Sequence, residues 1–451
     1  MSKLSTLAAI RFGYGLPLPE GAPESADAIL EILAGPDGAV TKWPSPSTTE
    51  LVSNVQELRL MQKAGRTAFA KNPKRVALLK TFSDAAATGT IATFARALDS
   101  EDGFRERLAT FWSDHFSVIS LRQVEAIYPF ALVDEAIRPN LTGNFADMLT
   151  AATLHPGMLS YLDQSSSVGP TSQIGKNQRK GLNENLAREV IELHSLGVGA
   201  GYSQADVTEM AKIFAGLRVD GDGLMVFQPQ RAEPGPRQLL GKSYETEGME
   251  NIRAALRDLA LRPETSQHLA RKLAVHFVSD SPDAELVKAM ATAYNDSGGD
   301  LMATYTAMLN NPAAWGEATE KARQPFDFMI ASFRALGVSG EQLQQMPYKQ
   351  FRGQVLASMA GMGQPFKRPA GPNGFDEAAE EWITPHGLAR RITWAMRVPA
   401  RLVKPLPDPV ALAQSCLADR ASEALLWGAA RAEDIAQGVG LVLASAEFNR
   451  R

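Results

Sequence analysis

The spacing of apolar residues along this chain predicts a mainly α-helical protein. Leucine, isoleucine, valine, phenylalanine and alanine recur three and four positions apart, as they do on the buried face of a helix. Alternation with a period of two, which marks a half-buried strand, is rare. Helical patterns cover, among others, residues 49–71, 73–98, 102–118, 249–261, 264–278, 282–297, 320–336 and 387–398. We therefore expect a multi-helix globular bundle.

One stretch, near residues 215–245, departs from the helical pattern. Residues 217–219 and 224–227 flank Asp220-Gly-Asp-Gly223, a composition typical of a β-hairpin closed by a glycine turn. A third strand-like piece over 238–244 is expected to join the same sheet. This stretch predicts a small β-hairpin insertion in a helical protein.

Two irregular segments interrupt the helices, but neither divides the chain into obvious domains. Residues 164–180 predict a loop of about 17 residues, long enough for a lid or a binding loop. Residues 363–387 contain four prolines and predict an extended arm. We expect a single integrated helical domain over 1–451. A division into 1–245, with the candidate site, and 246–451 is the alternative.

Polar side chains are most concentrated in the helical stretch 181–197. At 100° per residue, Glu184, Arg188, Glu189 and Glu192 share one face, whereas His194 lies among apolar residues on the opposite face. Three carboxylates around one arginine leave surplus negative charge, and such a carboxylate in a cleft can act as an acid or base. These four residues are our candidates for catalysis. A solvated network of ion pairs is the alternative.

Three histidines are candidate ligands for a divalent metal ion. His115 lies in an aromatic helical seam, His155 precedes a proline at a helix junction, and His194 lies on the apolar face of 181–197. Together with a carboxylate they would suit zinc or iron. Neither His-Glu-x-x-His nor Glu-x-x-His occurs, however. Histidines held in the core by hydrogen bonds are therefore the alternative.

The overall composition excludes several classes of protein. The chain has 451 residues and a net charge of −4, which gives no general attraction to nucleic acid. Its single cysteine, Cys416, cannot form an intramolecular disulfide. No apolar run reaches the roughly 18 residues of a membrane span. The first residues also lack the pattern of a signal peptide, so we expect a cytoplasmic protein.

Short motifs along nearly the whole chain resemble the bacterial "domain of unknown function 1800" family. They include Phe111-Trp-Ser-Asp-His115, Gly181-Leu-Asn-Glu-Asn185, Glu192-Leu-His194 and Gly363-Gln-Pro-Phe366. The resemblance implies a mainly helical fold and no established activity. Family members are often exported, which makes the periplasm the alternative location. They also often carry a histidine where this chain has Ala232.

Two functions of different classes are consistent with the sequence. In the first, the protein is an enzyme, with hydrolysis as the expected reaction, and a His/Glu/Arg cleft that binds a divalent metal. In the second, it is a non-catalytic binding or scaffold protein whose polar cluster is structural. In that case the arm over 363–387 would contact a protein partner.

Overall fold

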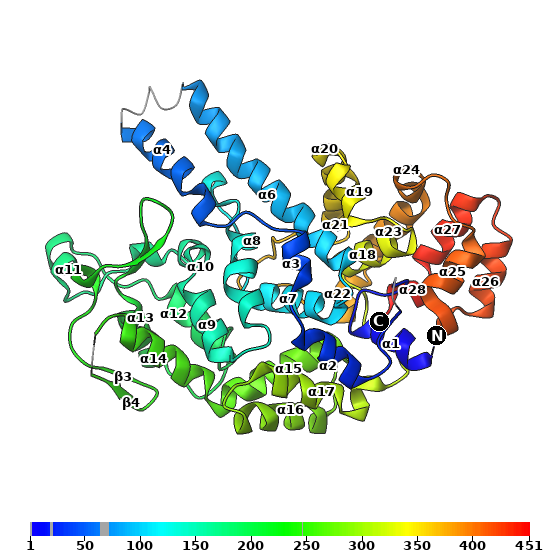
Figure 1. Ribbon diagram of the computed structural model, residues 1–451. Helices are drawn as coiled ribbons and strands as arrows, with labels where there is room; N and C mark the ends of the chain where they lie inside the picture. Colours follow the sequence, from blue (N-terminus) through cyan, green and yellow to red (C-terminus); the bar gives the residue numbers. More distant parts are fainter. Residues whose placement is uncertain (1, 19–20, 64–71, 246) are drawn as a thin grey trace.

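The computed structural model describes residues 2–18, 21–63, 72–245 and 247–451 and confirms a mainly helical fold (Figure 1). Its helices up to residue 214 are α1 (Lys3–Arg11), α2 (Ala26–Ala34), α3 (Gly38–Lys42), α4 (Val52–Lys63), α6 (Pro73–Asp99), α7 (Gly103–His115), α8 (Tyr128–Leu132), α9 (Phe145–Leu154), α10 (Pro156–Tyr161), α11 (Gln173–Gln178), α12 (Asn185–Glu192) and α13 (Gln204–Phe214). The predicted pattern over 49–71 thus ends, within the described residues, at Lys63.

The remaining helices lie beyond residue 248. They are α14 (Met249–Ala260), α15 (Pro263–Phe277), α16 (Ala284–Asp296), α17 (Leu301–Leu309), α18 (Pro325–Ala335), α19 (Gly340–Gln345), α20 (Tyr348–Phe351), α21 (Ala357–Gly361), α22 (Ala379–Trp382), α23 (Pro385–Arg397), α24 (Pro399–Leu402), α25 (Pro409–Leu417), α26 (Glu423–Ala430), α27 (Ile435–Ala444) and α28 (Ala446–Asn449). None of the described helices is long and apolar enough to cross a membrane.

Local sequence signals fix where many of these helices begin. Ser25 and Asp102 accept hydrogen bonds from backbone N–H groups in the first turns of α2 and α7. Ser203 and Asp206 form the reciprocal capping box of α13. Proline opens α6, α15, α18, α23 and α25, where its missing N–H costs nothing.

The β-structure consists of two separate hairpins, which confirms one strand expectation and corrects another. β1 (Leu217–Val219) pairs antiparallel with β2 (Met225–Phe227), as predicted. The third piece does not join them, because β3 (Arg237–Leu239) pairs instead with β4 (Lys242–Tyr244). Leu240 and Gly241 at their turn both have positive φ, the requirement for a tight two-residue turn.

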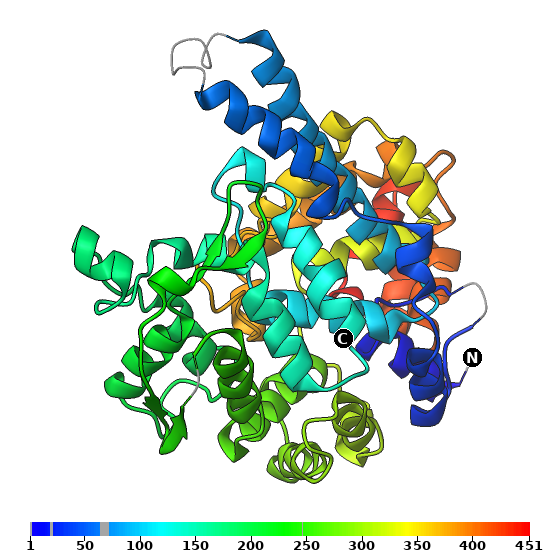
Figure 2. The same ribbon diagram turned by 60° about the vertical axis from the view of Figure 1, so that its left-hand side comes forward.

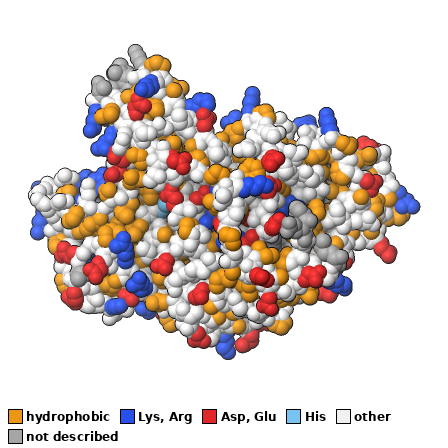
Figure 3. Space-filling view, viewed as in Figure 1, with side chains coloured by type: hydrophobic (Ala, Val, Ile, Leu, Met, Phe, Trp, Pro, Cys, Tyr) orange, Lys and Arg blue, Asp and Glu red, His pale blue; other side chains and the backbone are white. Residues whose placement is uncertain are grey.

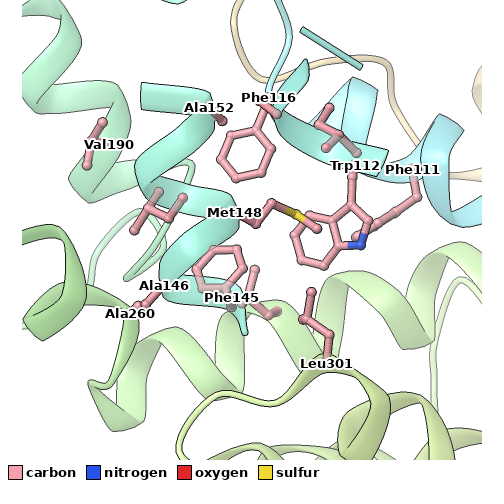
Figure 4. Packing of buried hydrophobic residues seen from close by; sticks show 14 of the residues in the cluster. Phe111, Trp112, Phe116, Phe145, Ala146, Met148, Ala152, Val190, Ala260 and Leu301 are labelled. Carbon is pink, nitrogen blue, oxygen red and sulfur yellow. The ribbon is translucent and has the colours of Figure 1, made fainter. Parts of the chain in front are cut away.

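The larger hydrophobic cluster packs α7 against α9, α12 and helices α13–α17. Figure 4 shows its centre, where Trp112 and Phe116 of the α7 segment meet Phe145 and Met148 of α9. Trp112 also donates a hydrogen bond of 2.9 Å to the hydroxyl of Tyr305. This cluster contains residues from Ala8 to Ala314, so residues on both sides of position 245 share one hydrophobic core.

A second hydrophobic cluster joins α6 and α18 to the C-terminal helices. It contains Phe94 and Phe326, whose rings lie 4.9 Å apart, and extends to Phe448. Figures 1 and 2 both show α4 and α6 projecting together from the body of the protein. The base of α6 contacts both α7 and α18, so it lies where the two clusters meet.

Two segments differ in detail from the predicted elements. The expected loop over 164–180 contains the short helix α11, whose N-terminal cap is Ser172. The predicted helix over 181–197 is α12, which ends at Glu192 rather than near residue 196. The backbone N–H of His194 donates to the backbone carbonyl of Glu189, five residues earlier, instead of four as in an α-helix. The α-helical hydrogen-bond pattern therefore ends at this point.

Candidate functional site

The principal pocket lies between the two hydrophobic clusters, against α7. Its empty volume, which includes open solvent at its mouth, is about 970 Å³. α6, α7 and α8 form one side. The arm after α21 forms the other, contributing Gln364, Phe366, Lys367, Phe375 and Glu377. Figure 3 shows acidic and basic side chains mixed over this face of the molecule, with no large patch of one sign among the residues that the structure describes. The pocket is therefore the better candidate for a binding site than the charged surface.

The two faces of α7 have different roles. Phe104, Leu108, Phe111, Trp112 and His115 point into the larger hydrophobic cluster or its edge. The pocket is lined instead by small or polar residues at positions 106, 109, 110 and 113, spaced three and four apart, together with Asp114 and, just beyond the helix, Ser117. One helix therefore supplies both the core and the polar wall of the pocket.

A serine and a lysine that line the pocket are joined by a hydrogen bond. The ammonium Nζ of Lys367 donates a hydrogen bond of 2.6 Å to Ser113 Oγ and a longer one of 3.3 Å to the carbonyl of Pro129. Burial lowers the pKa of Lys367 to about 8. Its backbone has a φ of +54°, an uncommon conformation for a residue other than glycine. An amine that loses its proton near pH 8 can activate a neighbouring serine as a nucleophile.

Asp114 adds a carboxyl group next to this pair. Burial raises the pKa of Asp114 to about 7, and the N–H of Phe375, which donates to both of its oxygens at 3.0 and 3.2 Å, opposes that shift. Near neutral pH the group therefore exchanges a proton, as an acid or base in a site does. Gly374 permits this contact, because a Cβ at that position would lie 2.4 Å from Asp114 Oδ2.

His276 and Glu377 form a polar pair in the wall of the pocket. His276 Nδ1 and Glu377 Oε1 lie 2.5 Å apart, and Arg107 Nη2 lies 3.0 Å from His276 Nε2. Burial lowers the pKa of His276 to about 4, so the ring is neutral at pH 7. It then accepts from Arg107 and donates to Glu377. Because both ring nitrogens are engaged, the pair holds the arm in place rather than offering a free base.

Buried ion pairs fix the remaining walls. Arg138 binds both oxygens of Glu106 and both oxygens of Asp37. Arg96 makes two hydrogen bonds to Asp134, at 2.5 and 2.8 Å. Bidentate arginine–carboxylate pairs of this kind fix the orientation of both side chains. The arginines of the pocket are therefore already neutralised by carboxylates of the chain.

The carboxylates predicted for catalysis lie outside this pocket. Arg188 bridges Glu184 and Glu192 at 3.4 and 3.1 Å, and Thr208 donates to Glu184. Burial raises the pKa of Glu189, with a further contribution from Glu192. None of these four residues of 181–197 is among those that line the pocket. Their partners are those of an α12–α13 surface network, and their catalytic role stays a prediction.

The structure brings His115 and His194 together, with their ring centroids 5.8 Å apart, and adds His268 at 6.2 Å from His115. His115 and His194 are 2% and 1% exposed, so both lie in closed core. Burial lowers the pKa of His194 to about 3 and that of His115 well below its usual value. These rings are neutral at pH 7 and pack as part of the core.

His155, the third predicted metal ligand, is held separately. Its Nε2 lies 3.2 Å from Glu135, and its Nδ1 accepts from the N–H of Gly157 at the start of α10. Within the described ranges, no three histidine, cysteine or carboxylate side chains are grouped so that they could hold a metal ion. Ala232 directly follows the short 3-10 turn Pro229–Arg231, which comes after β2.

The residues of the pocket were not predicted as a site from the sequence, although two of the short motifs contain or adjoin them. Ser113 and Asp114 lie inside the motif that ends at His115, and Lys367 follows the motif that ends at Phe366. The small and polar stripe on the second face of α7 was the local sign of a cavity. The predicted arm over 363–387 packs on its own chain through Lys367 and Glu377, and its role toward a partner stays a prediction.

Comparison with known proteins places the whole chain in one family. No curated protein and no solved structure matches it. The family described as "Protein of unknown function (DUF1800)" matches residues 11–450. This range includes α7, the arm and every residue of the pocket. The chain belongs to the DUF1800 family.

Proposed function

We propose that the protein is a hydrolase of carbonyl compounds in which Ser113 is the nucleophile and Lys367 is the general base. The observation that carries this proposal is the 2.6 Å hydrogen bond between Lys367 Nζ and Ser113 Oγ inside the principal pocket. A nucleophile hydrogen-bonded to its base in a concave site is the geometry required for acyl transfer.

The reaction uses the two residues in sequence. Lys367, as the neutral amine, takes the hydroxyl proton while Ser113 Oγ bonds to the substrate carbonyl carbon. The resulting ammonium gives this proton to the leaving oxygen or nitrogen as its bond to the carbonyl carbon breaks. Water then attacks the acyl–serine ester, Lys367 accepts a proton from that water, and the proton returns to Ser113 Oγ.

The surroundings support each role. Phe366 lines the pocket and packs against Phe130, and the Lys367 Nζ lies 5.9 Å from the centroid of the Phe130 ring. The face of this ring favours the ammonium, but desolvation by burial outweighs that effect and lowers the pKa of Lys367. The carbonyl of Pro129 accepts from Nζ and directs the amine toward Ser113. Asp134 and ionised Asp114 raise the pKa of Lys367, but desolvation by burial outweighs them and keeps the value at about 8.

Covalent labelling tests the proposal directly. The purified protein is treated at pH 9 with a fluorophosphonate, which traps activated serines, and the modified peptide is identified by mass spectrometry. We expect one phosphonate on Ser113. Lys367→Met should slow the labelling by at least about 100-fold, the usual contribution of a general base.

Matched variants separate this result from a loss of folding. Ser120→Ala removes a nearby hydroxyl outside the pocket, and Lys288→Met removes an exposed lysine of α16. Both should label like the unaltered protein, and thermal unfolding reports whether each variant is folded. Labelling that persists in Ser113→Ala, or no labelling of the folded unaltered protein, would overturn the proposal. The latter result would favour a binding protein.

A further inference from the structure

We propose that the substrate is an uncharged ester or amide whose acyl group is apolar and several carbon atoms long. This inference rests on the proposed function, because it places the acyl carbonyl at Ser113. It concerns the rest of the pocket, whose lining decides what else of the substrate can bind.

The walls around the serine are mainly apolar. Leu132 and Val133 lie on the side of α8, and Phe326 and Phe366 face the space from the other side. The rings of Phe326 and Phe366 are stacked, with centroids 5.9 Å apart and an angle of 23° between their planes. Such surfaces bind hydrocarbon by excluding water, with about a fourfold gain in binding for each buried methylene group.

The position of α7 leaves room for that hydrocarbon next to the nucleophile. Ala109 lies one helical turn before Ser113 and lines the same pocket. Its methyl group is the smallest side chain that still gives an apolar wall. The acyl chain of a substrate bonded at Ser113 can therefore extend along α7 past Ala109.

Negative groups on the substrate would lack a partner. Among the described residues that line the pocket, Arg138 is bound by Glu106 and Asp37, and Arg96 is bound by Asp134. Lys367 remains, but it must be uncharged to act as a base. A carboxylate or phosphate here would lose its water without gaining a cation, which is strongly unfavourable.

A positively charged group on the substrate would likewise find no free carboxylate among the described residues of the pocket. Both carboxylate oxygens of Glu106 accept hydrogen bonds from Arg138, and the carboxylate of Glu377 contacts His276 and Lys321. Both oxygens of Asp114 accept from the N–H of Phe375. Each described carboxylate of the pocket thus already has a partner within the chain, so the lining fits an uncharged molecule.

A series of p-nitrophenyl esters tests the substrate class with the unaltered protein. We measure kcat/KM for the acetate, butyrate, pentanoate and hexanoate, and for the monoester of glutarate, which matches the pentanoate in length but ends in a carboxylate. We expect kcat/KM to rise at least about 10-fold from acetate to hexanoate. The glutarate monoester should be at least about 10-fold poorer than the pentanoate.

A pocket variant checks that this preference comes from the proposed wall. Ala109→Val narrows the space beside Ser113 and should reduce kcat/KM for the hexanoate by more than that for the acetate. Ala424→Val, on an exposed side of α26, is the matched control and should change neither value. Phosphonate labelling of Ser113 in Ala109→Val reports that the altered protein is folded and still reactive.

The outcomes separate failure of this inference from failure of the proposed function. Hydrolysis that depends on Ser113 but is flat or falling from acetate to hexanoate overturns the substrate class alone. Equal rates for the pentanoate and the glutarate monoester overturn the uncharged class alone. If no ester is hydrolysed and no phosphonate attaches to Ser113, both proposals are wrong.

Discussion

Lys367 is the residue whose protonation controls the proposed chemistry. Its ammonium is buried against Phe130, and the nearest oxygens that accept from it belong to Ser113 and Pro129. Two neutral acceptors compensate a buried cation less well than a carboxylate would, so burial dominates and the pKa falls to about 8. The residue is thereby available as a base at ordinary pH, which an exposed lysine is not.

This pKa predicts the pH dependence of serine labelling. Because the neutral amine is the reactive form, the rate should rise from pH 6 to pH 9 with a midpoint at about 8. Ionised Asp114 raises the pKa of Lys367, so Asp114→Asn should move the midpoint to lower pH. Stopped-flow or timed mass spectrometry gives the rates. A rate that falls with pH would contradict the assignment of Lys367 as base.

His194 predicts a different pH effect, on stability. Both of its ring nitrogens are buried and lack a hydrogen-bond partner in the described structure, and burial lowers its pKa to about 3 from 6.5. The unfolded chain therefore binds a proton below pH 6.5 that the folded protein does not. Folding stability should be full above pH 6.5 and fall by about 1.4 kcal/mol per pH unit below it for this one residue.

Urea unfolding between pH 7.5 and pH 4.5 measures this contribution. His194→Leu should flatten the pH dependence by about that slope and remain folded at pH 7.5, since leucine suits an apolar site. His386→Leu is the control, because His386 is exposed. An unchanged slope in His194→Leu would show that the ring is not the group responsible for acid sensitivity.

At the scale of elements, the arm between α21 and α23 completes the pocket. It brings Lys367 to Ser113, Phe375 to Asp114 and Glu377 to His276, across more than 200 residues of chain in the first two contacts. The arm has little regular structure of its own, only the short helix α22. Contacts with α7 and α15 therefore set its conformation.

A substitution at Gly374 tests whether the arm packs against Asp114 of α7 as described. Its φ is +80°, and a Cβ there would lie 2.4 Å from Asp114 Oδ2 and 2.8 Å from the Asp114 carbonyl oxygen. Gly374→Ala should destabilise the protein by about 1–3 kcal/mol and slow labelling of Ser113 as the arm shifts. Gly353→Ala is the matched control, because nothing lies within 4 Å of its added Cβ. Equal effects of the two changes would contradict the proposed docking.

At the scale of the whole molecule, a buried charge network joins the two hydrophobic clusters. Arg107 of α7 lies 2.7 Å from Asp327 of α18, and Arg451 lies 3.2 Å from the same carboxylate. The side chains are 1%, 6% and 1% exposed, so water screens them little. Both arginines depend on Asp327 for compensation.

Asp327→Asn should therefore lower the free energy of unfolding by about 3–5 kcal/mol, since it leaves two buried cations without their common anion. Denaturant unfolding followed by circular dichroism and by tryptophan fluorescence gives this value. Asp84→Asn breaks an exposed pair with Lys80 and should cost less than about 1 kcal/mol. A small effect of Asp327→Asn would indicate that packing alone joins the clusters.

The helical class, many helix starts and the first hairpin could be predicted from the order of the residues alone. Ser25, Asp102 and Ser203 define helix starts within a few residues of themselves, so their effect can be recognised locally. The opposing faces of 181–197 were likewise visible, because the apolar Leu186 and Val190 are both fully buried. Such features depend on neighbours within one or two helical turns.

Which polar residues share a site could not be predicted in this way, because it depends on how distant parts of the chain pack. Ser113 and Lys367 are separated by 254 positions, and neither belongs to a motif that requires the other. Their proximity follows from how the arm packs on α7, and the pKa of Lys367 follows from the burial that this packing causes. Burial and long-range contact are properties of the folded chain, so a pattern of neighbouring residues could show the polar face of α7 but not its partner.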